Sequence, residues 1–296
     1  MTNNEDWREL YPFESNYLDL DGLRLHYLDQ SPDQANPILM VHGNPTWSFY
    51  WRNLVTALEG NNRVIVPDHI GCGLSDKPNN YNYCLEQHID NLEKLVTTLD
   101  LKNITLLVHD WGGAIGLGTA VRMPERISKI AVFNTAAFPP PYIPWRILAC
   151  RTPVFGKAAM QGLNLFAKAA LSMATVKPDR FTKQVCNGLL APYDTWANRV
   201  GIATFVADIP ITKSHPTYQV LDDIENNLKT LADKPIKLIW GAKDWCFRLE
   251  CMERFQTHWP KAQSHVFEDA GHYVIEDAHE RIVPLLEELL DSPNQS

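Results

Sequence analysis

The stretch "ITLLVHDWGGAIG", residues 104–116, is a run of apolar residues that ends in an acid and continues into paired glycines. The run predicts a buried strand, and an unpaired carboxylate is costly at the end of such a strand. Gly112 and Gly113 permit a sharp turn that pushes the Asp110 side chain out of the sheet, and the first N–H groups of the following helix stabilise its charge. This pattern is typical of a nucleophile elbow. It also fits a helix N-cap, so the surrounding residues must decide between the two.

Other short apolar runs lie on either side of this stretch, and each ends in Gly, Asn or Asp: "PILMVHG" at 37–43, "RVIVPD" at 63–68, "KIAVFN" at 129–134 and "IKLIWG" at 236–241. Strands that are apolar on both faces and alternate with helices predict a mostly parallel sheet covered by helices on both sides. Earlier in the chain, "NYLDLDGLRLHYLD" at 16–29 alternates around Asp21 and Gly22, which predicts an antiparallel hairpin. We therefore expect an α/β fold.

The pattern changes after residue 135. A proline cluster, "FPPPYIP" at 138–144, opens a stretch of helical periodicity without a convincing strand, and strand signals return at Lys237. This predicts a helical cap at 136–213, inserted into a core made of residues 1–135 and 214–296. Aromatic residues of the cap are expected to pack in a core or to line a pocket, and none of them is assigned to a site. They are Phe138, Trp145, Phe155, Phe166 and Trp196.

Composition and charge exclude several classes of function. The 296 residues have a net charge of -8 with Lys and Arg scattered along the chain, so nucleic acid is not an expected partner. The N-terminus lacks a signal-peptide pattern and no apolar stretch is long enough to span a bilayer, which favours a cytoplasmic protein. The six cysteines include no C-x-x-C pair, so we expect neither a disulfide framework nor a zinc site. "GCGLS" at 71–75 lacks the residues of a phosphate-binding loop, and no nucleotide cofactor is expected.

Candidate catalytic residues follow the predicted strands, because reactive groups gather at the carboxyl ends of strands in parallel sheets. Asp244 in "WGAKDW" and His272 in "DAGHYV" follow Asp110 in the chain order nucleophile, acid, histidine. The loop after the run at 129–134 offers Asn134 but no carboxylate, so Asp244 is the favoured partner of His272. His42, in "HGNP", is expected to support the site by a hydrogen bond.

Five segments together resemble the haloalkane dehalogenases of the α/β-hydrolase superfamily: "HGNPTWSFYWRNLV" at 42–55, "DHIGCGLSDKP" at 68–78, "HDWGG" at 109–113, "WGAKDWCF" at 240–247 and "DAGHYVIED" at 269–277. The β-lactone decarboxylases of bacterial olefin biosynthesis share the same catalytic pattern. The resemblance implies an α/β-hydrolase fold whose helical cap is inserted into the core. One departure is Val108, which stands where the general elbow motif has glycine.

The resemblance implies a haloalkane dehalogenase that acts on a hydrophobic small molecule without a cofactor or metal. Asp110 displaces the halide to form an alkyl ester, and water activated by His272 and Asp244 hydrolyses that ester. The side chains of Asn44 and Trp111 are the implied halide-binding pair, and both donate hydrogen bonds without carrying a charge. By position, the backbone N–H groups of the same two residues are the expected oxyanion hole.

Three alternatives remain open at this point. The first is a β-lactone decarboxylase that uses the same residues to give an alkene and carbon dioxide. The second is an epoxide hydrolase, which would need tyrosine donors from the cap, and Tyr142 and Tyr193 are available. The third is a non-catalytic receptor for small molecules, against which the intact set of Asp110, Asp244 and His272 argues.

Overall fold

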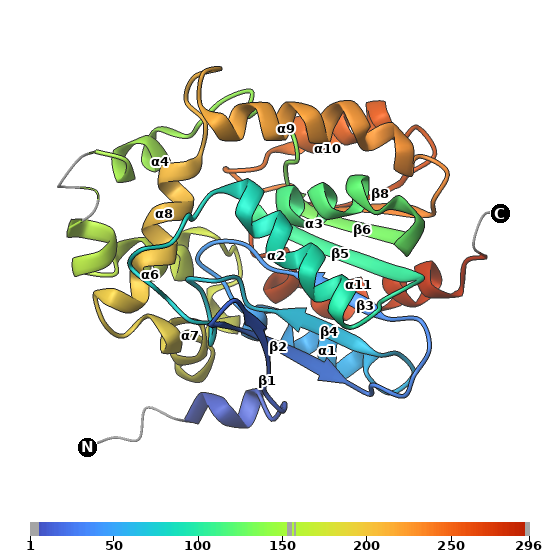
Figure 1. Cartoon of the computed structure of the whole chain (residues 1–296), viewed down its shortest axis with the longest axis horizontal. Coiled ribbons are helices and arrows are strands. Elements are labelled where there is room, and N and C mark those ends of the chain that lie inside the picture. The colour runs from blue at the N-terminus through green and yellow to red at the C-terminus, as the bar shows by residue number, and fades with distance from the viewer. Residues whose placement is uncertain (1–5, 153–155, 157, 294–296) are drawn as a thin grey trace.

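The computed structural model describes residues 6–152, 156 and 158–293, and it centres on one eight-stranded sheet (Figure 1). The strand order is β1-β2-β4-β3-β5-β6-β7-β8. β2 pairs antiparallel with β1 and β4, and the remaining neighbours are parallel. The strands are β1 (Asn16–Leu20), β2 (Leu23–Gln30), β3 (Ile38–Val41), β4 (Val64–Pro67), β5 (Ile104–Asp110), β6 (Ile127–Thr135), β7 (Ile236–Gly241) and β8 (Gln263–Phe267). The predicted α/β fold with a mostly parallel sheet is confirmed.

The predicted hairpin is also present, with Leu20 opposite Leu23. The two residues between them, Asp21 and Gly22, have φ angles of 54° and 92°. Two successive positive φ angles match a primed turn, whose twist agrees with that of the flanking strands. Asp and Gly tolerate this conformation, so local sequence decides the register here.

Helices cover both faces of the sheet. On one face lie α2 (Leu85–Thr98), α3 (Trp111–Arg122), α9 (Pro216–Asn227) and α10 (Leu249–His258), and on the other lie α1 (Arg52–Leu58) and α11 (Val274–Asp291). Alternate residues of one strand therefore enter different cores: in β3, Leu39 packs in the first core and Met40 in the second. This burial on both faces explains why the central strands are continuously apolar.

Among its described residues, the segment between β6 and β7 contains helices joined by loops and no strand (Figure 1). It contains α4 (Trp145–Cys150), α6 (Leu165–Met173), α7 (Lys183–Leu190) and α8 (Val200–Asp208), which lie together beside one edge of the core. We propose that residues 136–213 form the cap, since α9, which follows them, already packs on α3 of the core.

Short helices complete the description: η1 (Asp6–Leu10), η2 (Ser48–Trp51), η3 (Pro124–Arg126), η4 (Ala158–Gly162), η5 (Pro178–Arg180), η6 (Ala191–Tyr193), η7 (Ala197–Arg199) and η8 (Leu228–Leu231). Across the described ranges, no helix has both the length and the apolar character that crossing a membrane requires.

Candidate active site

Asp110 occupies a sharp turn between β5 and α3. Its backbone has φ 53° and ψ -129°, a conformation that is strained for any residue other than glycine. A Cβ atom at Gly112 would overlap the carbonyl of Val41, and one at Gly113 would overlap the side chain of Thr135, so both positions require glycine. The Asp110 side chain makes no capping hydrogen bond to α3. It is turned away from the helix, as an elbow requires and an N-cap does not.

The structure brings Asp110, His272 and Asp244 together at the carboxyl ends of the strands. His272 Nε2 lies 3.5 Å from Asp110 Oδ2, and His272 Nδ1 lies 2.9 Å from Asp244 Oδ2. Asp244 Oδ2 also accepts a hydrogen bond from Asn134 Nδ2 at 3.0 Å, and its Oδ1 accepts one from the Cys246 backbone N–H at 2.6 Å. Asn134 therefore positions the acid. All three members of the constellation are buried.

The two carboxylates determine the protonation of His272. Burial opposes its charge, but the charges of Asp244 and Asp110 and hydrogen bonds to both outweigh burial and raise the pKa of His272 to about 10. For Asp110, burial raises the pKa, but the hydrogen bond and charge of His272 outweigh it and lower the pKa overall. The resting site at neutral pH is an imidazolium held between two carboxylates.

This protonation predicts a loss of stability at alkaline pH. The folded-state pKa of His272, about 10, lies above the unfolded value of about 6.5. The contribution of protonated His272 to the free energy of unfolding is therefore complete below about pH 6.5 and is lost as pH rises through about 10. We expect the free energy of unfolding of the wild type to fall relative to that of His272→Phe across this window, as measured by urea denaturation at several pH values. Parallel pH dependences for the two proteins would contradict the assignment.

Asn44 and Trp111 flank Asp110 at the wall of a cavity. The Asn44 backbone N–H donates to Asp110 Oδ1 at 2.6 Å, and the Asn44 side-chain Nδ2 donates to the Ile202 carbonyl at 3.2 Å. An amide NH₂ carries two donors, so one remains for a ligand. The Trp111 indole packs against Phe205, with 5.3 Å between ring centroids. Both side chains line the cavity, where they can donate to an anion next to Asp110.

The cavity has a volume of about 520 Å³ and lies between the core and the cap. Asp110 and His272 are at its core end, and apolar side chains from both parts make up most of its wall. Of the cap aromatics, Phe138, Trp145 and Phe166 line it and Trp196 does not, while Phe155 lies outside the described residues. Such a wall suits a hydrophobic substrate.

Comparison with known proteins shows which families this chain resembles in sequence and structure. The family model described as "alpha/beta hydrolase fold" matches residues 36–161. The chain is 43% identical over 280 residues to the cis-3-alkyl-4-alkyloxetan-2-one decarboxylase of Shewanella oneidensis, covering 93% of this chain and 87% of that one. It is 37% identical over 293 residues to the protein of the same name from Xanthomonas campestris pv. campestris, covering 95% and 97%. The solved structure of the haloalkane dehalogenase DatA from Agrobacterium tumefaciens C58 superposes with a TM-score of 0.83 at 26% identity, covering 94% and 96%.

The chain belongs to the haloalkane dehalogenase-like family of the α/β-hydrolase superfamily. The resemblance stated from the five sequence segments is thereby confirmed, and the protein is an enzyme of this family. Within the described part of the chain, no group of three or more His, Cys, Asp or Glu side chains is arranged to hold a metal ion.

The two cap tyrosines of this dehalogenase-like enzyme are engaged away from Asp110. The Tyr142 hydroxyl donates to the Cys246 carbonyl at 2.6 Å, and the Tyr193 hydroxyl donates to the Thr46 carbonyl at 3.2 Å. Both hydroxyl protons are used in these bonds and are not available to a ligand oxygen above Asp110, so the geometry does not favour an epoxide hydrolase.

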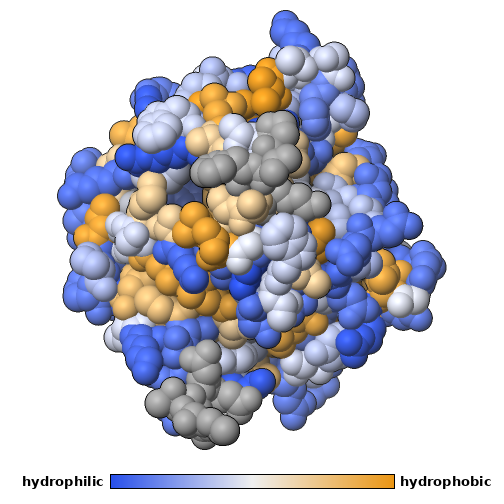
Figure 2. All heavy atoms as spheres, turned by 90° about the vertical axis from the view of Figure 1, so that its left-hand side faces the viewer, coloured by the Kyte–Doolittle hydropathy of each residue, from blue (hydrophilic) through white to orange (hydrophobic). Residues whose placement is uncertain are grey.

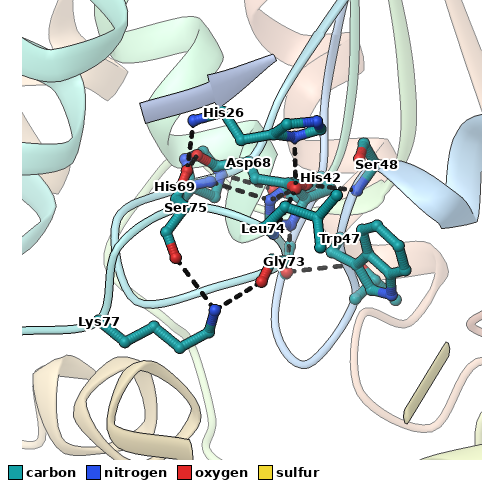
Figure 3. A network of polar contacts seen from close by, with 12 residues as sticks. His26, His42, Trp47, Ser48, Asp68, His69, Gly73, Leu74, Ser75 and Lys77 are labelled. Carbon is teal, nitrogen blue, oxygen red and sulfur yellow. Dashed lines mark hydrogen bonds and ion pairs between the residues drawn. The ribbon is translucent and has the colours of Figure 1, made fainter. Parts of the chain in front are cut away.

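Behind the loop that carries Asn44 lies a buried polar network centred on Asp68 (Figure 3). The Asp68 carboxylate accepts hydrogen bonds from His26 Nδ1 at 2.8 Å and from the backbone N–H groups of Ser48 and Leu74 at 2.7 and 2.8 Å. Burial raises its pKa, but the charge and hydrogen bond of His26 outweigh burial and lower the pKa overall. Asp68 therefore ties three separate segments together.

His42 and His69 connect this network to the loop of Asn44. The His69 backbone N–H donates to His42 Nε2 at 3.1 Å, and His69 Nε2 donates to the His42 carbonyl at 2.8 Å. Burial lowers the pKa of His42, which stays neutral and accepts this bond. His109 supports the site from the other side, because its Nε2 donates to the His272 carbonyl at 2.8 Å. The sequence predicts a supporting role for His42 only; the roles of His69 and Asp68 were missed, although Asp68 follows β4 much as Asp110 ends β5.

Removing the carboxylate of Asp68 is expected to destabilise the protein strongly. Asp68→Ala leaves His26 and two backbone N–H groups buried without their acceptor, which we expect to cost about 3–5 kcal/mol in the free energy of unfolding. Urea denaturation of the variant measures this loss. Asp223→Ala is the matched control, since Asp223 is exposed on α9 and its carboxylate accepts a hydrogen bond from the Gln219 side chain one turn away. Equal stability losses in the two variants would contradict the role given to the network.

Proposed function

We propose that the protein is a β-lactone decarboxylase that converts cis-3-alkyl-4-alkyloxetan-2-ones into alkenes and carbon dioxide. The observation that carries the proposal is the 43% identity, over 93% of the chain, to a decarboxylase of this name. The sequence motifs predict a haloalkane dehalogenase, with this activity as the alternative. The relatives favour the alternative, since the haloalkane dehalogenase of Mycolicibacterium paratuberculosis is 34% identical over 289 residues, against 43% and 37% for the two decarboxylases.

The first step is displacement at a saturated carbon. Asp110 attacks C4 of the lactone ring, the bond between C4 and the ring oxygen breaks, and an alkyl ester forms on Asp110. The ring oxygen leaves as part of a carboxylate that stays attached to C3. The side-chain N–H groups of Asn44 and Trp111 line the cavity beside Asp110 and stabilise this new anion. Loss of ring strain drives the opening.

The second step releases both products and restores the enzyme. The bond between C3 and the carboxylate breaks, its electron pair forms the C3–C4 double bond, and the C4–O bond to Asp110 breaks. Carbon dioxide and the alkene leave, and Asp110 is again a carboxylate. His272, whose Nε2 lies 3.5 Å from Asp110 Oδ2, stabilises the departing oxygen as an imidazolium. The reaction consumes no water, so it needs no free base, in agreement with a protonated His272.

A haloalkane dehalogenase is the second candidate, and the uncharged donors of Asn44 and Trp111 support it. In that reaction Asp110 displaces a halide, and water must then attack the carbonyl carbon of the ester. Alkylation removes the charge of Asp110, one of the two carboxylates that raise the pKa of His272, so a fraction of the esterified enzyme holds a neutral His272 that can act as a base. The same residues can therefore serve a hydrolytic side reaction.

A competition assay tests the proposal. Purified protein receives equal concentrations of a terminal bromoalkane and a cis-3,4-dialkyl β-lactone, and bromide and alkene release are followed together. We expect alkene release to dominate. Dominant bromide release would contradict the proposal in favour of a dehalogenase, and turnover of neither compound would contradict both activities.

A further inference from the structure

We propose that the cap, residues 136–213, docks on the surface of an anionic lipid bilayer and holds the mouth of the cavity against the lipid. The first observation is an uneven distribution of exposed apolar side chains. Among the residues that the structure describes, eight large hydrophobic side chains are exposed, and all except Tyr17 belong to the cap. They are Trp145, Leu148, Leu163, Leu165, Met173, Trp196 and Ile211. Isolated exposed apolar residues are ordinary, but a concentration of them on one part of a protein marks an interaction surface.

These side chains gather around the entrance of the cavity. Trp145 is 73% exposed, and Trp145, Leu165 and Met173 all line the cavity as well. Trp196 adjoins Gly162, where an added Cβ would lie 3.4 Å from its ring, and Gly162 precedes the exposed Leu163. Figure 2 views the side of the molecule on which α4, α6 and α8 lie, and apolar side chains occupy much of its centre. The apolar surface and the cavity are therefore continuous.

Charge is divided between the cap and the core. Residues 136–213 contain nine Lys and Arg and three Asp, a net charge of +6, whereas the rest of the chain has 18 basic and 32 acidic residues, a net charge of -14. Arg146, Lys168 and Lys213 are exposed, and none forms an ion pair within the described residues. Arg146 lies over the rings of both Trp145 and Trp245, so cationic and aromatic groups share one surface.

This combination fits an anionic bilayer. Tryptophan and leucine side chains insert at the boundary between headgroups and acyl chains, and lysine and arginine beside them attract anionic headgroups. The acidic core is repelled by the same surface, so the electrostatic field orients the molecule with its cap toward the lipid. The cavity then leads from the acyl-chain region to Asp110. This last step rests on the proposed function, because a lactone with two alkyl chains dissolves in a bilayer.

Vesicle flotation tests the docking surface without turnover. Wild-type protein and Asp110→Ala are mixed with phosphatidylcholine vesicles that either contain or lack phosphatidylglycerol. We expect both proteins to float with the anionic vesicles, to bind neutral vesicles weakly and to dissociate as salt is added. Failure of the wild type to bind anionic vesicles at low salt would overturn the proposal. Binding by both proteins without any alkene formation would leave the docking surface standing and contradict only the proposed function.

Paired variants locate the surface. Lys168→Gln and Lys213→Gln are each expected to weaken vesicle binding by about fivefold, and the double variant Leu163→Ala/Trp196→Ala by about fivefold or more. None of these four residues lines the cavity, so turnover of a water-soluble short-chain lactone should be unchanged while turnover of a vesicle-borne lactone falls. Tyr17→Ala and Lys102→Gln are the matched controls, since both residues are exposed on the surface of the α/β part of the chain, outside the cap.

Two outcomes would overturn the assignment of the cap as the lipid-binding surface. Equal vesicle binding by the cap variants and the controls would overturn the assignment of the cap. Self-association of the wild type that the cap variants abolish, measured by analytical ultracentrifugation and found without vesicle binding, would assign the face to the acidic core of a second copy and overturn the proposal.

Discussion

Asp110→Ala is expected to lower kcat/KM for alkene release by about 10⁴-fold or more. The variant has no oxygen that can form the ester, and neither His272 nor Asp244 lies where it could replace Asp110 as the nucleophile. The binding of the lactone depends mainly on the apolar cavity and should change little. Steady-state assays of alkene release measure the first effect, and calorimetric titration with the lactone measures the second.

Asp110→Asn is the closest control, because it keeps the volume of the side chain and removes the charge. It should be as inactive as Asp110→Ala, although it can still accept the Asn44 N–H bond. Activity within tenfold of the wild type in either variant, with no other carboxylate modified by the substrate, would mean that the lactone opens without an ester on Asp110.

His272→Phe should form the ester on Asp110 but release it very slowly. The first step requires only Asp110 and the donors of Asn44 and Trp111, whereas the second loses the imidazolium that stabilises the departing carboxylate. We expect turnover to fall by about 10²–10⁴-fold and the Asp110 peptide to gain the mass of the whole lactone. Incubation with a bromoalkane should instead add the mass of the alkyl group alone, because the bromide leaves.

The control for this trap is the double variant Asp110→Ala/His272→Phe, which should gain no mass. Phe is compatible with the site, since Phe247 already packs against the His272 ring with 5.7 Å between centroids. Wild-type rates of alkene release from His272→Phe, without any adduct, would contradict the two-step scheme.

The parts of this fold that were predictable depend on local chemistry. The stretch at 104–116 predicts a strand, a turn and a helix because an apolar run and two glycines act within a few residues of each other. The hairpin at Asp21 and Gly22 is predictable for the same reason. Asp110, Asp244 and His272 could be nominated because parallel strands bring their carboxyl ends to one edge.

Features that depend on contacts between distant segments were not predictable. Asp68 looks like any other acid after a strand, and only the folded chain shows that its carboxylate joins segments containing His26, Ser48 and Leu74. The directions of the Tyr142 and Tyr193 hydroxyls likewise depend on which backbone carbonyls the cap meets. The positive charge of the cap does not show as a cluster in the sequence, because its Lys and Arg residues are spread along 78 positions of the chain.

The sequence motifs also do not distinguish a haloalkane dehalogenase from a β-lactone decarboxylase. Displacement at a carbon–halogen bond and at the C4 position of a β-lactone both need a carboxylate nucleophile, a histidine and neutral donors for an anionic leaving group. The reactions differ in what happens to the ester, which depends on whether water reaches it and whether a carboxylate lies on the neighbouring carbon. Similarity over the whole chain, rather than the catalytic residues, favours the decarboxylase.

The central claim is that the Asp110 ester collapses by losing carbon dioxide and is not hydrolysed. The most direct test is repeated turnover of the lactone in water enriched in ¹⁸O, followed by mass analysis of the Asp110 peptide. Hydrolysis at the carbonyl carbon of the ester would place solvent oxygen in the Asp110 carboxylate, whereas collapse of the ester leaves both of its oxygens in place. We predict alkene formation with an unlabelled Asp110 peptide. Labelling of Asp110 in step with lactone consumption would contradict the account and make the enzyme a hydrolase of the lactone.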